Sequence, residues 1–159
     1  MKKRLTALLV LLLILCGCKT PVDPEPAPKP ETPEKEETPV KEPVLKMFIE
    51  DKEIAVTWEN NETVLALKEL AKNGDITIRM SMYGGWEQVG PLGASLPADN
   101  HRITTRPGDI VLYSGNQIVV FYGPNTWEYT MLGHMDGLSD EEITRLLDNG
   151  DITLTLSLE

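Results

Sequence analysis

The sequence predicts a mainly-β fold, a closed barrel of about eight strands with two α-helices, preceded by a disordered tether. Three observations support this prediction. Apolar and polar side chains alternate with a period of two along several segments of residues 44–159, as in half-buried strands. Near residues 61–74 and 139–150, apolar residues recur at helical spacing and are bounded by capping residues. A closed barrel is favoured over an open sheet because closure removes unpaired strand edges.

Residues 1–17 have the pattern of a secretory signal peptide. Lys2, Lys3 and Arg4 give the segment a positive start, and a largely apolar run of eleven residues follows at positions 5–15. That run is shorter than the roughly 20 residues of a membrane-spanning helix. The segment Leu15-Cys16-Gly17-Cys18 resembles the bacterial lipobox, which implies that residues 1–17 form a lipoprotein signal peptide and that Cys18 becomes the lipidated N-terminus.

The lipobox resemblance implies an extracytoplasmic bacterial lipoprotein whose partner is a membrane, held through acyl chains such as palmitate on Cys18. Two or three acyl chains anchor a protein stably, whereas a single chain binds only marginally. Cys16 would leave with the signal peptide, so the mature chain would hold neither a free thiol nor a disulfide. The alternative, a disulfide between Cys16 and Cys18, is disfavoured by the geometry of so short a loop.

Residues 18–43, the lipidated cysteine and a Pro/Glu-rich segment, are predicted to be a disordered linker. Nineteen of the twenty-five residues from 19 to 43 are proline or charged, and such a composition supports no packed core. In the polyproline conformation, at about 3.1 Å per residue, the linker would reach up to roughly 75 Å. A second interpretation is that the proline-rich stretch is itself a ligand for a groove on another protein.

The predicted domain, residues 44–159, begins with strands. Alternating apolar residues predict a strand pair at 45–49 and 54–58, with a turn at Asp51-Lys52. Asn60-Asn61 offers N-cap chemistry before an apolar stripe at helical spacing, and Gly74 ends that helix. The alternation along residues 76–83 predicts the next strand.

The second half of the domain starts with a segment rich in glycine and proline, residues 84–108, where we expect loops with short strand pieces around Trp86 and Ile103. Apolar runs at 110–113 and 118–122 predict a buried hairpin. A strand at 127–132 should precede a helix that Ser139 and Glu142 open with a capping box. Residues 152–158 alternate throughout and predict the last strand.

Several motifs in this domain resemble those of the bacterial cyclophilin-like fold family. In chain order they are Tyr83-Gly84-Gly85-Trp86-Glu87, Leu96-Pro97, Pro107-Gly108-Asp109-Ile110-Val111-Leu112-Tyr113, Phe121-Tyr122 and Asn125-Thr126-Trp127-Glu128-Tyr129-Thr130-Met131-Leu132-Gly133. The resemblance implies a cyclophilin-like β-barrel over residues 44–159, in a family that occurs on lipoproteins and beside flavodoxin-type domains. It implies no particular reaction.

Aromatic side chains suggest where a ligand would bind. Seven of the nine aromatic residues lie between Tyr83 and Tyr129, and aromatic residues with a polar tip are common in binding sites. Tyr113 and Phe121 lie in runs that predict core strands. The alternative is a packed barrel end with no ligand. The residues that we expect to contact a ligand are Tyr83, Trp86, Glu87, Gln117 and Trp127.

The function predicted from these observations is a lipid-anchored, non-enzymatic module that binds a small molecule or a peptide. A first alternative is a peptidyl-prolyl cis-trans isomerase, because Asn100-His101-Arg102-Ile103 is similar to the segment that carries the catalytic arginine of true cyclophilins. In that case Arg102 would be the catalytic residue. The residues that follow lack the glycine-rich Phe and Gln segment of those enzymes, which weakens this alternative. A second alternative is a passive interaction protein of the cell envelope.

Composition excludes several other classes. The net charge is −10, and the whole excess lies in residues 44–159, so we expect no nucleic-acid partner. His101 and His134 share no ligand spacing and are expected to be isolated on the surface, so no metal is predicted. Acidic residues 136–142 coincide with a helix start, which favours carboxylates. We expect no cofactor, because the chain has no phosphate-binding glycine loop, and no hydrolase activity, because it lacks a Gly-x-Ser-x-Gly turn.

Overall fold

A computed structural model describes residues 43–159 of the protein. The predicted signal peptide, the lipidation site Cys18 and nearly all of the predicted linker lie outside these residues. The described residues form ten strands and two helices. In chain order the elements are β1 (Leu45–Ile49), β2 (Lys52–Ile54), β3 (Val56–Trp58), α1 (Glu62–Ala71), β4 (Ile76–Tyr83), β5 (Glu87–Pro91), β6 (His101–Thr104), β7 (Asp109–Tyr113), β8 (Gln117–Phe121), β9 (Thr126–Met135), α2 (Asp140–Leu147) and β10 (Ile152–Leu158).

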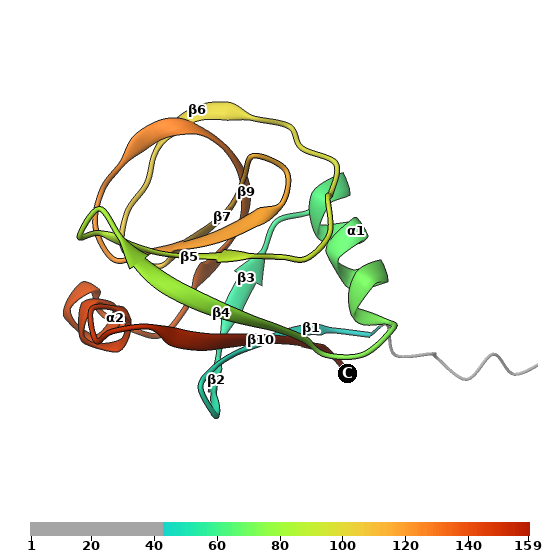
Figure 1. Ribbon diagram of the computed structural model, residues 1–159, viewed down its shortest axis with the longest axis horizontal. Coiled ribbons are helices and arrows are strands. Elements are labelled where there is room, and N and C mark those ends of the chain that lie inside the picture. Colours follow the sequence, from blue (N-terminus) through green and yellow to red (C-terminus); the bar gives the residue numbers. More distant parts are fainter. Residues whose placement is uncertain (1–42) are drawn as a thin grey trace, which may run out of the picture. The chain divides into compact units, whose positions relative to one another are not determined.

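The strands form a nearly closed barrel, as the sequence predicts. Their order is β2-β1-β10-β4-β5-β8-β7-β9-β3, with β6 attached to β9 outside this path. The two ends of the path, β2 and β3, are consecutive in the chain and are separated only by Ala55. One bent strand therefore pairs with β1 in its first half and with β9 in its second half. Counted in this way the barrel has eight strands (Figure 1).

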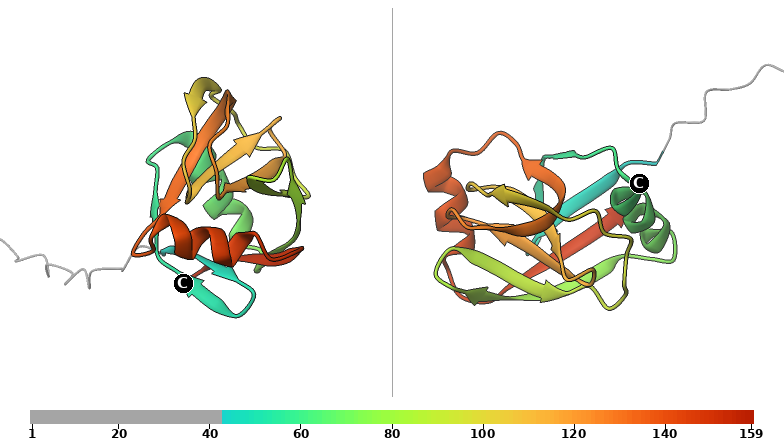
Figure 2. Two further views of the ribbon diagram at one scale, coloured as in Figure 1. Left: turned by 90° about the vertical axis from the view of Figure 1, so that its left-hand side faces the viewer. Right: turned by 90° about the horizontal axis from the view of Figure 1, so that it is seen from above.

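The two helices lie at opposite ends of the barrel (Figures 1 and 2). Asn61 caps α1, since its Oδ1 accepts the backbone N–H of Val64 at 2.9 Å. Ser139 and Glu142 form the predicted capping box at the start of α2. The backbone N–H and hydroxyl of Ser139 donate to the Glu142 carboxylate at 2.8 and 2.9 Å, and these bonds lower the pKa of Glu142. Both helices point apolar residues, including Leu67 and Leu147, into the barrel core.

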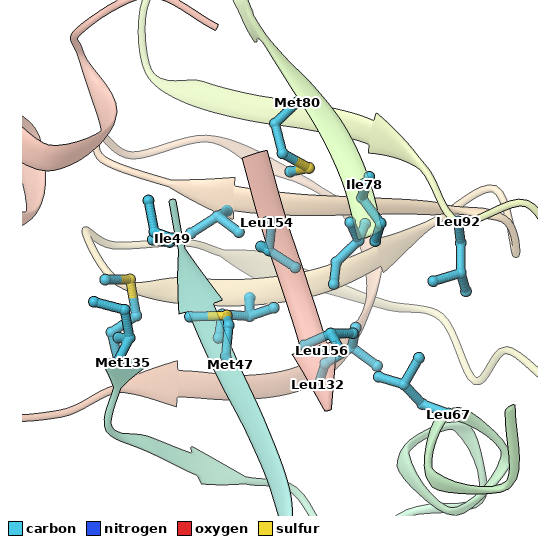
Figure 3. Close-up of a cluster of buried hydrophobic side chains, with 14 of the residues drawn as sticks. Met47, Ile49, Leu67, Ile78, Met80, Leu92, Leu132, Met135, Leu154 and Leu156 are labelled. Atoms are coloured by element: carbon cyan, nitrogen blue, oxygen red, sulfur yellow. The ribbon is translucent and has the colours of Figure 1, made fainter. Parts of the chain in front are cut away.

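The barrel interior is filled by one large apolar cluster (Figure 3). Alternate residues of most strands point into it, and most of them are completely buried. Gly90 of β5 is required here, because a Cβ at this position would lie 2.5 Å from the side chain of Ile78 and 2.8 Å from the carbonyl oxygen of Arg79. The labelled members in Figure 3 are Met47, Ile49, Leu67, Ile78, Met80, Leu92, Leu132, Met135, Leu154 and Leu156.

The structure refines the predicted elements in three places. The strand expected at 54–58 starts earlier and is interrupted at Ala55, and the strand expected at 127–132 extends to Met135. Trp86 lies in a turn and not in a strand, because Gly84 and Gly85 both take positive φ and reverse the chain before β5. No helix in residues 43–159 is both long enough and apolar enough to cross a membrane.

Candidate functional site

The strands β5, β7 and β8 are covered on both faces. The inward residues of β7 and β8 belong to the barrel core, while the outward residues Val111, Val119 and Phe121 form a second, smaller apolar cluster with Tyr129 of β9. Burial on both faces explains why β7 and β8 are continuous apolar runs without alternation. Because the outer cluster is buried, another part of the chain must cover the outside of the barrel at this place.

The cover is a two-stranded ribbon made of β6 and the first half of β9. β6 pairs with β9 from His101 opposite Tyr129 to Thr104 opposite Thr126. A register shift between Ile110 and Val111 interrupts the pairing of β9 with β7, and a bulge of this kind bends a strand and redirects its side chains. In Figure 1 the ribbon arches over the upper part of the barrel, away from β1 and β10.

A pocket of about 490 Å³ is lined by the ribbon and the outer face of β5 and β8. Small-molecule sites have volumes of roughly 300–1,000 Å³. The floor is apolar, because Val89 and Val119 are directly opposite each other in the β5–β8 pair. The complete set of lining residues is Tyr83, Glu87, Val89, Tyr113, Gln117, Val119, Asn125, Trp127 and Tyr129.

Among residues 43–159, Glu87 is the only charged residue that lines the pocket. Its side chain is 6 % exposed, and its Oε2 atom has no hydrogen-bond partner among residues 43–159. None of the ion pairs within the described residues includes it. Burial raises the pKa of the Glu87 carboxyl, and hydrogen bonding from the Asn125 side chain partly opposes this rise. A buried carboxylate oxygen without a hydrogen-bond partner lowers the stability of the fold, so structural stability does not account for a glutamate at this position.

Asn125 is fixed beside Glu87 by the loop that connects β6 to β7. The buried Thr105 donates its N–H to the Asn125 carbonyl at 2.8 Å and accepts the Asn125 N–H on its hydroxyl at 3.0 Å. The Asn125 side-chain oxygen accepts the N–H of Thr126 at 2.8 Å, which leaves the amide nitrogen to donate to the Tyr129 hydroxyl at 2.9 Å. This part of the pocket wall is therefore held in one orientation.

The Tyr129 ring connects this polar wall to the apolar cluster. It packs edge-on against Phe121 and Tyr113, with ring centroids 5.5 and 5.9 Å away. Burial, assisted by the charge of Glu87, raises the pKa of Tyr129 to about 12. The phenol is therefore protonated at neutral pH, and its hydroxyl hydrogen is available to a partner.

Four of the five residues expected to contact a ligand lie together around this pocket. Tyr83 and Glu87 face each other across the β4–β5 pair, Gln117 begins β8, and Trp127 lies on the ribbon. Trp86 does not line it. The Trp86 indole lies against Gly84. The backbone carbonyl oxygen of Trp86 accepts the backbone N–H groups of Tyr122 and Gly123.

The prediction that Tyr113 is a core residue is wrong. Tyr113 is 36 % exposed and lines the pocket, because it shares the outward face of β7 with Val111. Phe121 is fully buried, as predicted, although in the outer cluster. Four further lining residues were not predicted: Val89, Val119, Asn125 and Tyr129. The sequence places Asn125 four residues before Tyr129, but this spacing alone is no signal of a site. Only the fold shows that both side chains turn toward Glu87.

Arg102 lies on the other face of the ribbon. In an antiparallel pair, directly opposite residues share a face, and successive residues alternate between faces. Trp127 and Tyr129 line the pocket, so Arg102, which is opposite Glu128 and exposed, is on the face that points away. The structure thus separates Arg102 from the aromatic pocket.

His134 is not isolated on the surface, contrary to prediction. It is half-buried, and its Nδ1 lies 2.8 Å from Oδ1 of Asp109. Asp109 also accepts the N–H of Arg106 at 2.9 Å and is opposite His134 in the β7–β9 pair. This pair ties the β6–β7 loop to the barrel. His101 is exposed, as expected. Within residues 43–159 no group of three potential ligands among His, Cys, Asp and Glu is close enough to hold a metal ion.

Comparison with known proteins yields one match. A sequence model described as the cyclophilin-like family matches residues 47–157, which is nearly all of the barrel. No curated protein and no solved structure matches the chain.

Proposed function

The chain belongs to the cyclophilin-like family, and from this premise we propose that it is a binding module, lipid-anchored outside the cytoplasm, that holds a small molecule or a peptide segment in the pocket beside β5. The observation that carries the proposal is the combination of an apolar floor, an aromatic rim and one buried carboxylate with an unpartnered oxygen in a cavity of about 490 Å³. Binding sites have this composition, with a few placed polar groups among apolar and aromatic side chains.

The residues around the pocket favour binding over catalysis. Among the described residues its lining includes no Ser, Thr, Cys, Lys or His, so the common pairing of a Ser, Thr or Cys nucleophile with a histidine base is missing there, and so is a cationic electrophile. Glu87, Asn125 and Gln117 can instead orient a ligand through hydrogen bonds. The tethered architecture expected from the sequence would present this pocket away from a membrane surface.

Ligand binding can be tested by NMR on the soluble mature chain, residues 18–159 with Cys18→Ser. We expect proline-containing peptides, including a copy of residues 19–43, or members of a small-molecule library to shift the Trp127 indole and the Asn125 side-chain amide. The Trp58 indole is an internal control, because its N–H donates to the Leu45 carbonyl at 2.8 Å and neither residue belongs to the pocket lining. Signals that stay silent for every compound would contradict the binding proposal and favour a passive envelope protein.

The same titration separates binding from prolyl isomerisation. Catalysed exchange between the cis and trans forms of a peptide would establish the alternative activity, and Arg102→Ala would then test the arginine. We expect shifts without catalysed exchange, because Arg102 occupies the face of the ribbon opposite to Trp127 and Tyr129.

Anchoring is tested separately in a bacterial host. Cys18→Ser should abolish acylation and move the protein out of the membrane fraction, whereas Cys16→Ser should leave both unchanged. Unaltered membrane association of the Cys18→Ser variant would contradict the anchor.

A further inference from the structure

The Glu87 carboxylate lacks a counter-charge within the domain. Residues 44–159 hold ten more acidic than basic side chains, so many carboxylates have no ion-pair partner. Where such a carboxylate is exposed, the missing partner costs little stability, because water solvates the charge. Glu87 is different, since its Oε2 atom is shielded from solvent and unpartnered among the described residues. Such a group is stabilised when a cation or a hydrogen-bond donor enters beside it.

The side chains around Glu87 favour a cation over a neutral donor. Four aromatic rings line the same pocket, those of Tyr83, Tyr113, Trp127 and Tyr129. An aromatic ring attracts a positive charge at its face, and the attraction grows when the charge is desolvated. Because no Lys, Arg or His in the described part of the chain lines the pocket, no positive charge of the lining competes for this position.

We propose that the pocket recognises the protonated amine of its ligand, with the Glu87 carboxylate as the counter-charge and the aromatic rings as the surrounding wall. This inference rests on the proposed binding function and specifies the class of ligand. The volume of about 490 Å³ accommodates an ammonium group together with an apolar body over Val89 and Val119. Asn125, fixed by Thr105, and the protonated Tyr129 hydroxyl supply neutral polar contacts at the same wall.

Three probes of one shape test the inference on the soluble mature chain: benzylamine, benzyl alcohol and benzoate. At neutral pH these are a cation, a neutral molecule and an anion. We expect benzylammonium to shift the Trp127 and Asn125 signals with an affinity at least tenfold above that of benzyl alcohol, and benzoate to bind most weakly. Amidated Nα-acetyl-lysine is a fourth probe. If it binds, the lysine side chain of a peptide can supply the amine; if only benzylamine binds, the amine must come from a small molecule.

A matched pair of variants assigns the preference to one carboxylate. Glu87→Gln should reduce the preference for benzylammonium over benzyl alcohol at least tenfold while benzyl alcohol still binds. Glu128→Gln removes the same charge from the opposite face of the ribbon and should leave the preference unchanged. Since glutamine matches glutamate in shape, retained benzyl alcohol binding also shows that the variant is folded.

The outcomes distinguish this inference from the proposed function. Equal affinity of the three probes, or a preference that survives Glu87→Gln, overturns the amine inference and leaves a pocket that binds ligands without regard to charge. If none of the probes, peptides or library compounds reaches the pocket, both the inference and the binding proposal are overturned.

Discussion

The Glu87 carboxylate is placed where its ionisation opposes folding, which makes it a test of the electrostatics of the pocket. Burial raises its pKa in the folded chain, so the unfolded chain releases this proton more readily. Stability is consequently greatest below the ordinary carboxyl pKa, decreases as pH rises through the pKa of the folded state, and stays lower above it. Glu87→Gln removes this dependence, because the amide carries no charge.

We therefore expect Glu87→Gln to raise the free energy of unfolding at pH 7 and to leave it unchanged at pH 3. Urea unfolding of the two proteins between pH 3 and pH 8 measures the difference, with the exposed Glu128→Gln as the control. A variant that is less stable than the native chain at pH 7 would show that the contacts of the Glu87 carboxylate, such as that with Asn125, outweigh the cost of its burial.

Gly133 is a second residue whose role depends on its surroundings. A Cβ at this position would lie 2.7 Å from the carbonyl oxygen of Thr57 and 3.2 Å from the Cα of Trp58. Gly133 is opposite Trp58 in the β3–β9 pair, by which the second half of the bent strand closes the barrel. The bent strand can therefore approach β9 only because no side chain separates them.

Gly133→Ala should destabilise the domain by about 1–3 kcal/mol, the usual cost of overpacking. It should also accelerate amide hydrogen exchange in β3. Gly74→Ala is the control, since a Cβ there meets no atom within 4 Å and the substitution strains only a positive-φ position at the end of α1. Unchanged exchange in β3 after Gly133→Ala would show that the barrel does not depend on this close approach.

At the scale of elements, both predicted helices and most of the predicted strands are confirmed, because their signals are local. Alternation along residues 76–83 and 152–158 fixes which side chains enter the core, and capping residues fix where α1 and α2 begin. The faces of β7 and β8 were not predictable in this way. With both faces buried, the runs at 110–113 and 118–121 have no period, so the sequence could not show that Tyr113 faces outward.

The contacts between distant elements were likewise not predictable. Sequence reasoning placed His134 on the surface because its partner Asp109 lies 25 residues earlier and is brought to it only by strand pairing. Four of the five residues expected to contact a ligand do surround one pocket, because strand pairing and the ribbon bring them together. Their neighbour Asn125 was missed, since its orientation depends on Thr105, twenty residues away.

Asn61 connects α1 to β9, and substitutions of this residue measure how much the connection contributes to stability. Its side-chain oxygen caps α1 at the N–H of Val64, while its amide donates to the Met131 carbonyl of β9 at 2.8 Å. Asn61→Ala removes both bonds, and Asn61→Asp retains a cap while removing the amide donor. We expect losses of about 2 and about 1 kcal/mol in the free energy of unfolding, since a cap and a hydrogen bond each contribute about 1 kcal/mol. Equal stability of Asn61→Asp and the native chain would show that the bond to β9 contributes nothing.

At the scale of the whole molecule, the barrel is closed by the bent strand, because β2 and β3 are the two ends of the sheet path and follow each other in the chain. Val44 and Glu159 lengthen the neighbouring β1–β10 pair by exchanging backbone hydrogen bonds at 2.6 and 3.0 Å. The argument from strand edges predicted this closure correctly, because a sheet with this many strands would otherwise expose two edges. It did not predict the ribbon, whose β6 strand stands outside the barrel path and creates the pocket.

The same closed domain carries a strong charge imbalance. Residues 44–159 hold eighteen acidic and eight basic side chains, and few of the acidic groups are paired within the described residues. Mutual repulsion among them opposes the compact state and is reduced by salt, since the Debye length falls to about 8 Å at 0.15 M.

We expect the melting temperature of the soluble mature chain to rise as NaCl is increased from 0.02 to about 0.3 M and then to level off. The plateau is the informative part, because screening saturates once the Debye length is shorter than the spacing of the charges, whereas stabilisation by excluded solutes continues to grow. Calorimetry at fixed pH measures the curve, and NaCl can be compared with sucrose at equal osmolality. A melting temperature that is flat or falls over this range would show that the ion pairs of the domain, such as Lys46 with Glu53 and Glu159, outweigh the repulsion among its unpaired carboxylates.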